Sequence, residues 1–151
     1  MKKMTISDGD FSEFLRIARK INFFSQMTLG WVEKILAFGM LYEYKKGEQV
    51  FRQGGPGDSF YIIHSGKLAV TVKSGFFSFP KKVAVLGPGD FFGEMALIDR
   101  APRTATVTCE EPSKLFILLA DHFDEAFKGN PAFADEVRRT ISERKFGLNQ
   151  Q

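Results

Sequence analysis

The chain has 151 residues, of which 44% are hydrophobic and 14% aromatic, and its formal net charge at pH 7 is +3. A chain of this length forms one compact domain that buries about two-thirds of its unfolded surface. Its 21 Lys and Arg residues are scattered among 18 acidic residues, which argues against nucleic-acid binding through bulk charge. The single cysteine, Cys109, excludes an internal disulfide and a cysteine-ligated metal cluster.

The sequence contains no pattern for export or membrane insertion. Residues 1–10 are polar and lack the apolar run of a signal peptide, and the longest apolar stretches, such as residues 115–120, are too short to cross a bilayer. With the lone cysteine, these features predict a stand-alone cytoplasmic protein that makes no membrane contact.

Residues 10–41 have apolar side chains at helical spacing, first around Phe14 and then around Ile35, which predicts N-terminal helices. Ser25 and Thr28 are candidate caps at the junction of these helices. The helical period returns over residues 121–147, where Pro131 interrupts it and separates two C-terminal helices.

Between these helical regions, residues 42–119 alternate between short β-favouring runs and turns rich in Gly, Pro and Asp. The runs have the length and composition of strands and lie at residues 60–63, 68–72, 83–86 and 115–119. Their spacing is typical of a small antiparallel barrel or jelly roll. The predicted fold is therefore mainly β, a jelly-roll barrel with flanking helices, and forms a single domain over residues 1–151.

One segment, residues 92–107, interrupts the rhythm of the strands. Residues 94–98 are helix-compatible but suffice for about one turn; Gly93 gives a flexible entry, and Pro102 prevents the helix from continuing into Arg103. The first N–H groups of such a turn are free to bind a phosphate, which the Arg103 guanidinium could reach from the other side. Glu94 is an acceptor suited to a sugar hydroxyl. These residues together predict a nucleotide site.

The same segment resembles the phosphate-binding cassette of the cyclic nucleotide-binding domain family, which is shared by catabolite-activator-type regulators, cyclic nucleotide-dependent kinases and cyclic nucleotide-gated channels. The resemblance rests on Phe-Gly-Glu-Met-Ala-Leu at residues 92–97 and Pro-Arg-Thr-Ala-Thr-Val at residues 102–107. Residues 47–48, 54–58, 60–63 and 65–67 resemble the glycine-punctuated early strands of that family. The resemblance thus extends over residues 11–146 and implies a double-stranded β-helix.

The resemblance implies a ligand, cAMP or cGMP, and a role for each cassette residue. No cofactor is expected, and the shortage of histidine and cysteine ligands argues against a metal. Glu94 would bind the ribose 2′-hydroxyl and Arg103 the exocyclic phosphate oxygens. Thr104 could bond the phosphate or the amino group of a syn guanine, which leaves both nucleotides open. The remaining acceptors would meet backbone N–H groups around Met95, Ala96 and Ala105. The full predicted set is Phe92, Gly93, Glu94, Met95, Ala96, Arg103, Thr104 and Ala105.

In that family a C-terminal helix closes over the base, and Arg144 and Lys145 are the matching candidates for capping it. The resemblance implies a non-enzymatic sensor whose lid helix moves on ligand binding and is read by an effector protein. No helix-turn-helix follows the lid, so binding of nucleic acid is not expected, and a homodimer is left open.

Two alternatives remain from the sequence: a protein-interaction barrel with a non-functional cassette, and, less favoured, a small cupin-like enzyme. His64 and His122 are too far apart in sequence to supply the histidine cluster of a cupin metal site. The loop around Phe79, with Phe76 and Phe77, either packs over one end of the barrel or forms a partner surface.

Overall fold

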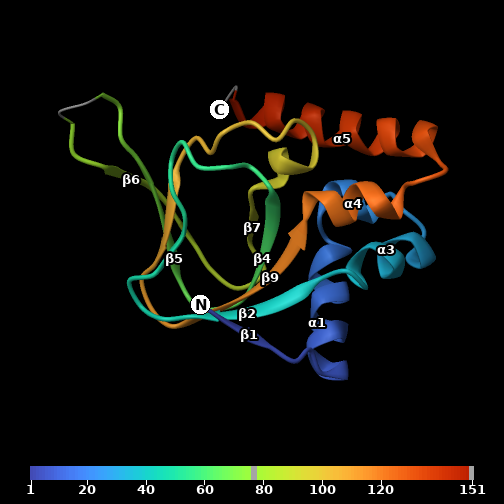
Figure 1. The fold of residues 1–151 in the computed structure, drawn as a ribbon, viewed down its shortest axis with the longest axis horizontal. Coiled ribbons are helices and arrows are strands. Elements are labelled where there is room, and N and C mark those ends of the chain that lie inside the picture. Colours follow the sequence, from blue (N-terminus) through green and yellow to red (C-terminus); the bar gives the residue numbers. More distant parts are fainter. Residues whose placement is uncertain (76–77, 150–151) are drawn as a thin grey trace.

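The computed structural model describes residues 1–75 and 78–149, without the side chains of residues 22, 23 and 144–149. The fold is mainly β, with antiparallel sheets and flanking helices, which confirms the fold class predicted from the sequence (Figure 1). The described strands form two separately hydrogen-bonded sheets in place of one closed barrel. The predicted jelly roll is thus a sandwich of two sheets.

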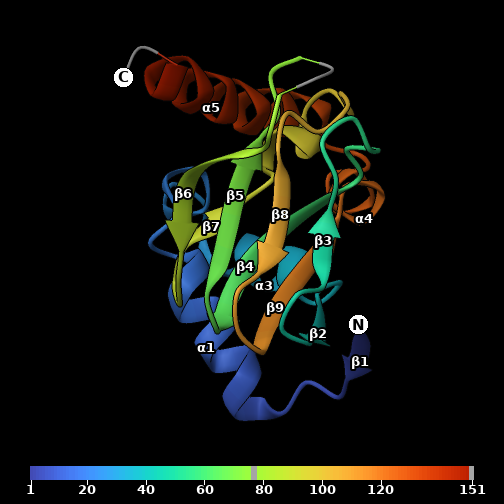
Figure 2. The same cartoon turned by 90° about the vertical axis from the view of Figure 1, so that its left-hand side faces the viewer.

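The larger sheet has the order β1-β2-β9-β4-β7, and the smaller sheet has the order β3-β8-β5-β6 (Figure 2). The strands of the larger sheet are β1 (Lys2–Met4), β2 (Met40–Tyr44), β4 (Ser59–Ser65), β7 (Phe91–Phe92) and β9 (Ser113–Leu119). Those of the smaller sheet are β3 (Gln49–Phe51), β5 (Leu68–Val72), β6 (Lys81–Leu86) and β8 (Thr106–Cys109). The short β1 strand was not expected from the polar N-terminal sequence.

The core lies on both faces of the larger sheet because successive side chains of a strand point to opposite faces. On β9, Leu115 and Ile117 pack between the two sheets, whereas Phe116 and Leu118 pack against the helices. The Phe116 ring stacks on Phe14 of α1 with ring centroids 4.3 Å apart. A side chain buried in this way contributes about 1.5–3 kcal/mol, so β9 anchors both layers.

Five helices cover the outer face of the larger sheet and the cassette: α1 (Asp8–Ala18), α2 (Asn22–Ser25), α3 (Leu29–Leu36), α4 (Ala120–Ala126) and α5 (Pro131–Asn149). Thr28 caps α3, since its side chain accepts a hydrogen bond from the Trp31 N–H. Ser25 lies inside α2 and does not cap a helix, so that prediction was wrong. Among the described residues, no helix is long and apolar enough to span a membrane.

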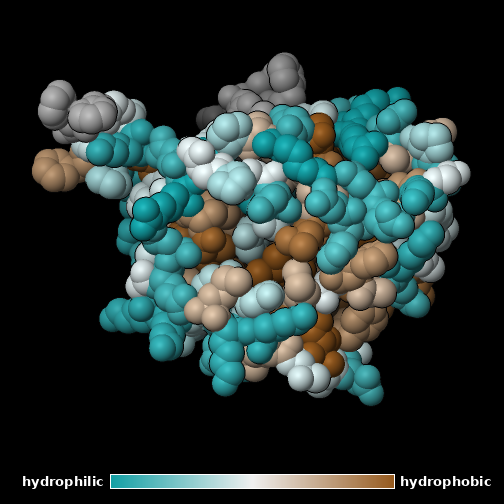
Figure 3. Space-filling view, viewed as in Figure 1, coloured by the Kyte–Doolittle hydropathy of each residue, from teal (hydrophilic) through white to brown (hydrophobic). Residues whose placement is uncertain are grey.

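The surface is apolar in places. Figure 3 shows a hollow in the middle of one face where hydrophobic side chains gather among hydrophilic ones. Phe79, between β5 and β6, is 92% exposed and therefore does not pack over an end of the sandwich. Phe76 and Phe77 lie outside the described residues.

Candidate functional site

The cassette begins where β7 ends. Gly93 has a φ of +80°, a left-handed conformation that favours glycine, and it starts the 3₁₀ helix η1 (Glu94–Leu97). This confirms a short helical turn at the predicted place. Arg103 lies in the connection that follows, and β8 begins at Thr106, so the strand starts later than the sequence indicated.

The turn and the connection enclose a cavity of about 260 Å³. All eight residues predicted for the ligand line it: Phe92, Gly93, Glu94, Met95, Ala96, Arg103, Thr104 and Ala105. The wall also includes Phe51 of β3, Val70 of β5 and Val107 of β8, which belong to the smaller sheet. Residues 92–96 and 103–105 thus line the same cavity. The roles of these eight residues in binding stay a prediction.

Arg103 is the buried cation of this cavity, with only 8% of its surface exposed. Its Nη2 donates to the Ser59 carbonyl at 2.7 Å and lies 3.9 Å from an Asp58 carboxylate oxygen. The guanidinium carbon lies 4.1 Å from the centre of the Phe51 ring and 5.8 Å from that of Tyr61. One aromatic face and the start of β4 therefore fix the side chain.

The charge of Arg103 is only partly compensated. Its Nε is buried and has no hydrogen-bond partner among the described residues. Burial lowers the pKa of the guanidinium, although Tyr61 and Asp58 act in the opposite direction. Arginine stays protonated in proteins, so the buried charge persists. The Asp58 side chain is 65% exposed and at the limit of ion-pair distance, so it compensates the charge of Arg103 only in part. An anion in the cavity would compensate the rest of this charge.

The backbone of Arg103 is held by the glycine-rich turn that precedes β4. The Arg103 N–H donates to the Gly55 carbonyl at 2.9 Å, and the Gly54 N–H donates to the Arg103 carbonyl at 2.7 Å. A Cβ on Gly57 would lie 2.2 Å from the Ala101 carbonyl oxygen. The close packing of these two loops requires a glycine at position 57 and places Arg103 beside the cavity.

Gly93 is required for the same reason on the other side. A Cβ on Gly93 would lie 2.9 Å from Arg103 Nη1 and 3.1 Å from the Ser59 carbonyl oxygen. The absence of a side chain therefore lets the guanidinium reach the start of η1. A cation, the start of a short helix and the Glu94 carboxyl group now line one cavity, an arrangement suited to a phosphate linked to a hydroxyl-bearing sugar.

Sequence reasoning missed the residues that support Arg103. Phe51, Ser59 and Tyr61 are remote from the cassette in sequence, and only strand pairing brings them to it. The turn at residues 54–58 was recognised, but nothing local indicated that it holds Arg103. Arg144 and Lys145, predicted to cap a base, belong to α5, and their side chains lie outside the described residues.

The two histidines do not converge. His64 Nε2 lies 3.4 Å from an Asp10 carboxylate oxygen, whereas His122 stacks on Phe38 with ring centroids 5.1 Å apart. Among the described residues no group of three His, Cys, Asp or Glu side chains could hold a metal ion. Cys109 is buried in β8, where burial raises the pKa of its thiol.

Fold and site together define a jelly roll with a cavity, lined by a buried arginine, at a short helical turn. Residues 41–130 match the model of the family described as the cyclic nucleotide-binding domain. That match covers more than half of the sequence, and the chain belongs to this family. The resemblance seen in the sequence is confirmed.

Similar proteins and solved structures agree with this family assignment. The chain is 33% identical over 138 residues to a cGMP-dependent protein kinase of Drosophila melanogaster, covering 91% of this chain and 14% of the kinase. It is 40% identical over 101 residues to the cAMP-dependent protein kinase regulatory subunit of Dictyostelium discoideum, covering 66% of this chain and 29% of that subunit. The co-crystal structure of the regulatory domain of Toxoplasma gondii PKA with cAMP superposes with a TM-score of 0.72 at 26% identity, covering 88% and 50% of the two chains. The chain thus spans a small part of the kinases it matches.

Proposed function

We propose that the cavity binds a cyclic nucleotide, cAMP or cGMP, and that the protein is a cytoplasmic sensor without enzymatic activity. Arg103 binds the exocyclic phosphate oxygens, Glu94 the ribose 2′-hydroxyl, and backbone N–H groups at Met95, Ala96 and Ala105 the remaining acceptors. The observation that carries this proposal is the buried Arg103 guanidinium, whose Nε has no partner among the described residues beside the cavity.

The energetics of burial support this role for Arg103. An incompletely paired charge in a protein interior is destabilising, so a structure that keeps one beside a cavity favours the entry of an opposite charge. A phosphodiester supplies two exocyclic oxygens, which match the planar donor set of a guanidinium. The cavity volume of about 260 Å³ lies just below the range of small-molecule sites, which starts at about 300 Å³.

Both nucleotides are retained as ligands. Thr104 is exposed and lines the cavity, where its hydroxyl can reach a phosphate or a purine substituent. The similar proteins include a cGMP-dependent kinase and a regulatory subunit of a cAMP-dependent kinase, so they favour a cyclic nucleotide without choosing between the two.

The output of the sensor is a movement of α5, which an effector protein reads. Leu97 of η1 belongs to the same apolar cluster as Val137 and Ile141 of α5, so a displaced turn alters the packing of the helix. A ligand shifts the position of α5 only by its differential affinity for the two arrangements.

Calorimetric titration of the protein with cAMP and with cGMP tests the proposal. We expect saturable binding of at least one nucleotide and a loss of about a hundredfold in Arg103→Ala, because charged hydrogen bonds contribute roughly 1.5–3 kcal/mol each. Arg52→Ala is the matched control, since Arg52 is exposed, bonds Gln49 and does not line the cavity. Binding of neither nucleotide by the folded wild type would leave the interaction module with a non-functional cassette as the better description.

A further inference from the structure

The end of the cassette turn is held by an arginine that sequence reasoning did not single out. Arg100 has a φ of +57° and is the one non-glycine residue with positive φ in the described part of the chain. A long side chain in this region is strained and persists only where other contacts fix it. Here Nη1 of Arg100 donates to the Ala96 carbonyl at 2.7 Å, which ties the side chain back to η1.

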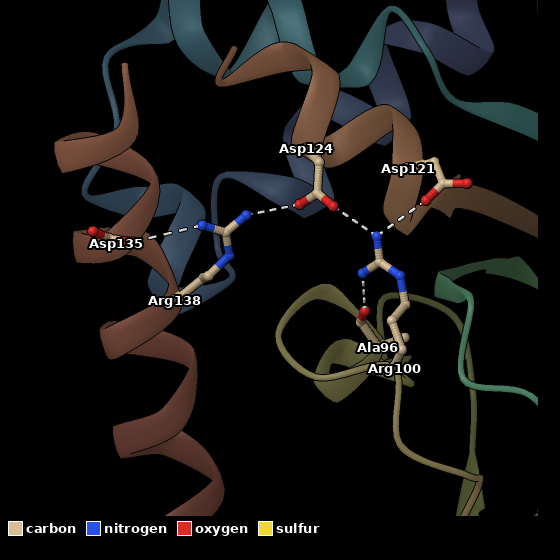
Figure 4. Close-up of polar contacts among 6 residues, drawn as sticks. All are labelled: Ala96, Arg100, Asp121, Asp124, Asp135 and Arg138. Carbon is tan, nitrogen blue, oxygen red and sulfur yellow. Dashed lines mark hydrogen bonds and ion pairs between the residues drawn. The ribbon is translucent and has the colours of Figure 1, made fainter. Parts of the chain in front are cut away.

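The same guanidinium crosses to α4. Its Nη2 lies 2.7 Å from Oδ2 of Asp124 and 3.2 Å from Oδ1 of Asp121 (Figure 4). The strained turn of the cassette is therefore bonded to η1 on one side and to α4 on the other.

Asp124 is also bonded to α5. Its second oxygen, Oδ1, accepts a hydrogen bond from Nη2 of Arg138 at 2.8 Å, and Nη1 of Arg138 lies 3.7 Å from Asp135 (Figure 4). One carboxylate thus stands between two guanidinium groups, the first from the cassette and the second from α5. Asp121 contacts only Arg100 and Asp135 only Arg138 among the ion pairs of the described residues.

The network is only partly exposed: the side chains of Arg100, Asp124 and Arg138 are 36%, 43% and 30% accessible. Isolated surface ion pairs contribute little to the free energy of unfolding. Both oxygens of the Asp124 carboxylate are bonded, however, so a shift of one guanidinium moves the carboxylate and changes its interaction with the other guanidinium. The interaction free energy between residues of one such network is large enough to measure.

We propose that Asp124 links the cassette turn to α5, so that displacement of Arg100 changes the strength of the ion pair between Asp124 and Arg138. The proposal rests on the proposed function only for the input, a nucleotide that moves the turn. The linkage itself is a property of the ligand-free protein and is tested there.

Hydrogen exchange of the α5 amides, residues 132–143, measures the linkage. Arg100→Gln removes a charge that touches η1 and α4, and we expect about threefold faster exchange in α5, since the partly exposed pairs are screened. Asp124→Asn removes the negative charge and replaces one of the two acceptor oxygens by an amide NH2 donor, so it cannot accept hydrogen bonds from both arginines in the present geometry. In the Asp124→Asn background, Arg100→Gln is therefore expected to leave α5 exchange unchanged.

Matched controls come from the network itself. Asp121→Asn and Asp135→Asn each remove an outer carboxylate and leave the shared one, and we expect α5 exchange to change much less than in Asp124→Asn. Arg100→Gly, which adopts a φ of +57° without strain, serves where Arg100→Gln does not fold. Unchanged α5 exchange in both Arg100 variants, or equal acceleration with and without Asp124, would overturn the linkage.

Adding cAMP or cGMP separates the two proposals. In the wild type the nucleotide is expected to alter α5 exchange, and in Asp124→Asn it is expected to bind while the α5 response shrinks. A full α5 response in Asp124→Asn would also overturn the linkage. A wild type that binds neither nucleotide refutes the proposed function, whereas the ligand-free comparison above still decides the linkage.

Discussion

The Arg103 guanidinium lies over the Phe51 ring, with its carbon 4.1 Å from the centre of the ring. The two residues come from the cassette and from β3, and both line the same cavity. The ring shields one face of the guanidinium from water, so the edge that carries the hydrogen-bond donors remains for a ligand.

Phe51→Leu tests this contact. Leucine keeps an apolar side chain but lacks the ring face, and a desolvated cation–π contact contributes about 1 kcal/mol, so we expect nucleotide affinity to fall about fivefold. Calorimetry measures the loss. Phe38→Leu, at a ring that stacks on His122 away from the cavity, should bind like the wild type. Equal losses in both variants would mean that a general loosening of the fold is responsible.

Gly93→Ala should weaken nucleotide binding, because the added methyl group would lie against the Arg103 guanidinium. The new Cβ would crowd Arg103 Nη1 and sit at a φ of +80°. Gly89→Ala is the control, because its φ of +86° carries the same backbone strain with no atom within 4 Å. We expect both to lower thermal stability, and only Gly93→Ala to reduce nucleotide affinity by about tenfold or more.

Glu94→Ala distinguishes the ribose contact from general electrostatics. If Glu94 binds the 2′-hydroxyl, its removal should reduce affinity for cAMP or cGMP by about tenfold and leave the 2′-deoxy analogues almost unaffected. Asp99→Asn is the control carboxylate on the same wall, where it accepts a hydrogen bond from the Ala101 N–H. Equal losses for nucleotide and deoxy analogue would place the sugar elsewhere.

Gly66→Ala should be strongly destabilising. Gly66 has a φ of +109°, and its Cβ would lie 2.0 Å from Ser113 Oγ at the start of β9. Gly54→Ala has comparable backbone strain, φ +84°, and open space. We expect Gly54→Ala to cost about 1–2 kcal/mol and Gly66→Ala about 1–3 kcal/mol more, read from denaturant unfolding. Similar losses would show that Ser113 moves aside readily.

Asp10 predicts a pH dependence of stability. Its hydrogen bonds with Ser7 lower the pKa of the Asp10 carboxyl group below 3.8, and His64 contributes in the same direction. A carboxyl group with a lowered pKa in the folded state stabilises the protein above about pH 4, and this contribution is lost as the pH falls further.

Unfolding measured from pH 6 to pH 3 should therefore show a stability difference between wild type and Asp10→Asn that shrinks at low pH. Asp8→Asn, in the same helical turn but outside the capping box, is the matched variant for comparison. A constant difference across this range would contradict the assigned role of the carboxylate.

The local chemistry of the sequence determined the cassette. Gly93, Glu94 and Arg103 fall within one short segment, so turn geometry, helix length and the block at Pro102 could be read from neighbouring residues. The core strands were also recognised, because β5 and β9 consist of β-favouring residues bounded by turns.

Only the tertiary structure decided what surrounds the cassette. Phe51 lies under Arg103, and Asp124 stands between Arg100 and Arg138, through contacts that join segments far apart in the chain. Periodicity assigns a residue to a face of its own strand or helix, but the partner on the other side is selected by how whole elements pack. The sequence therefore determined the glycine-led turn of the cassette and the place of Arg103 after it, whereas packing of the sheets and helices decided the depth of the cavity, its aromatic wall and the link to α5 through Asp124 of α4.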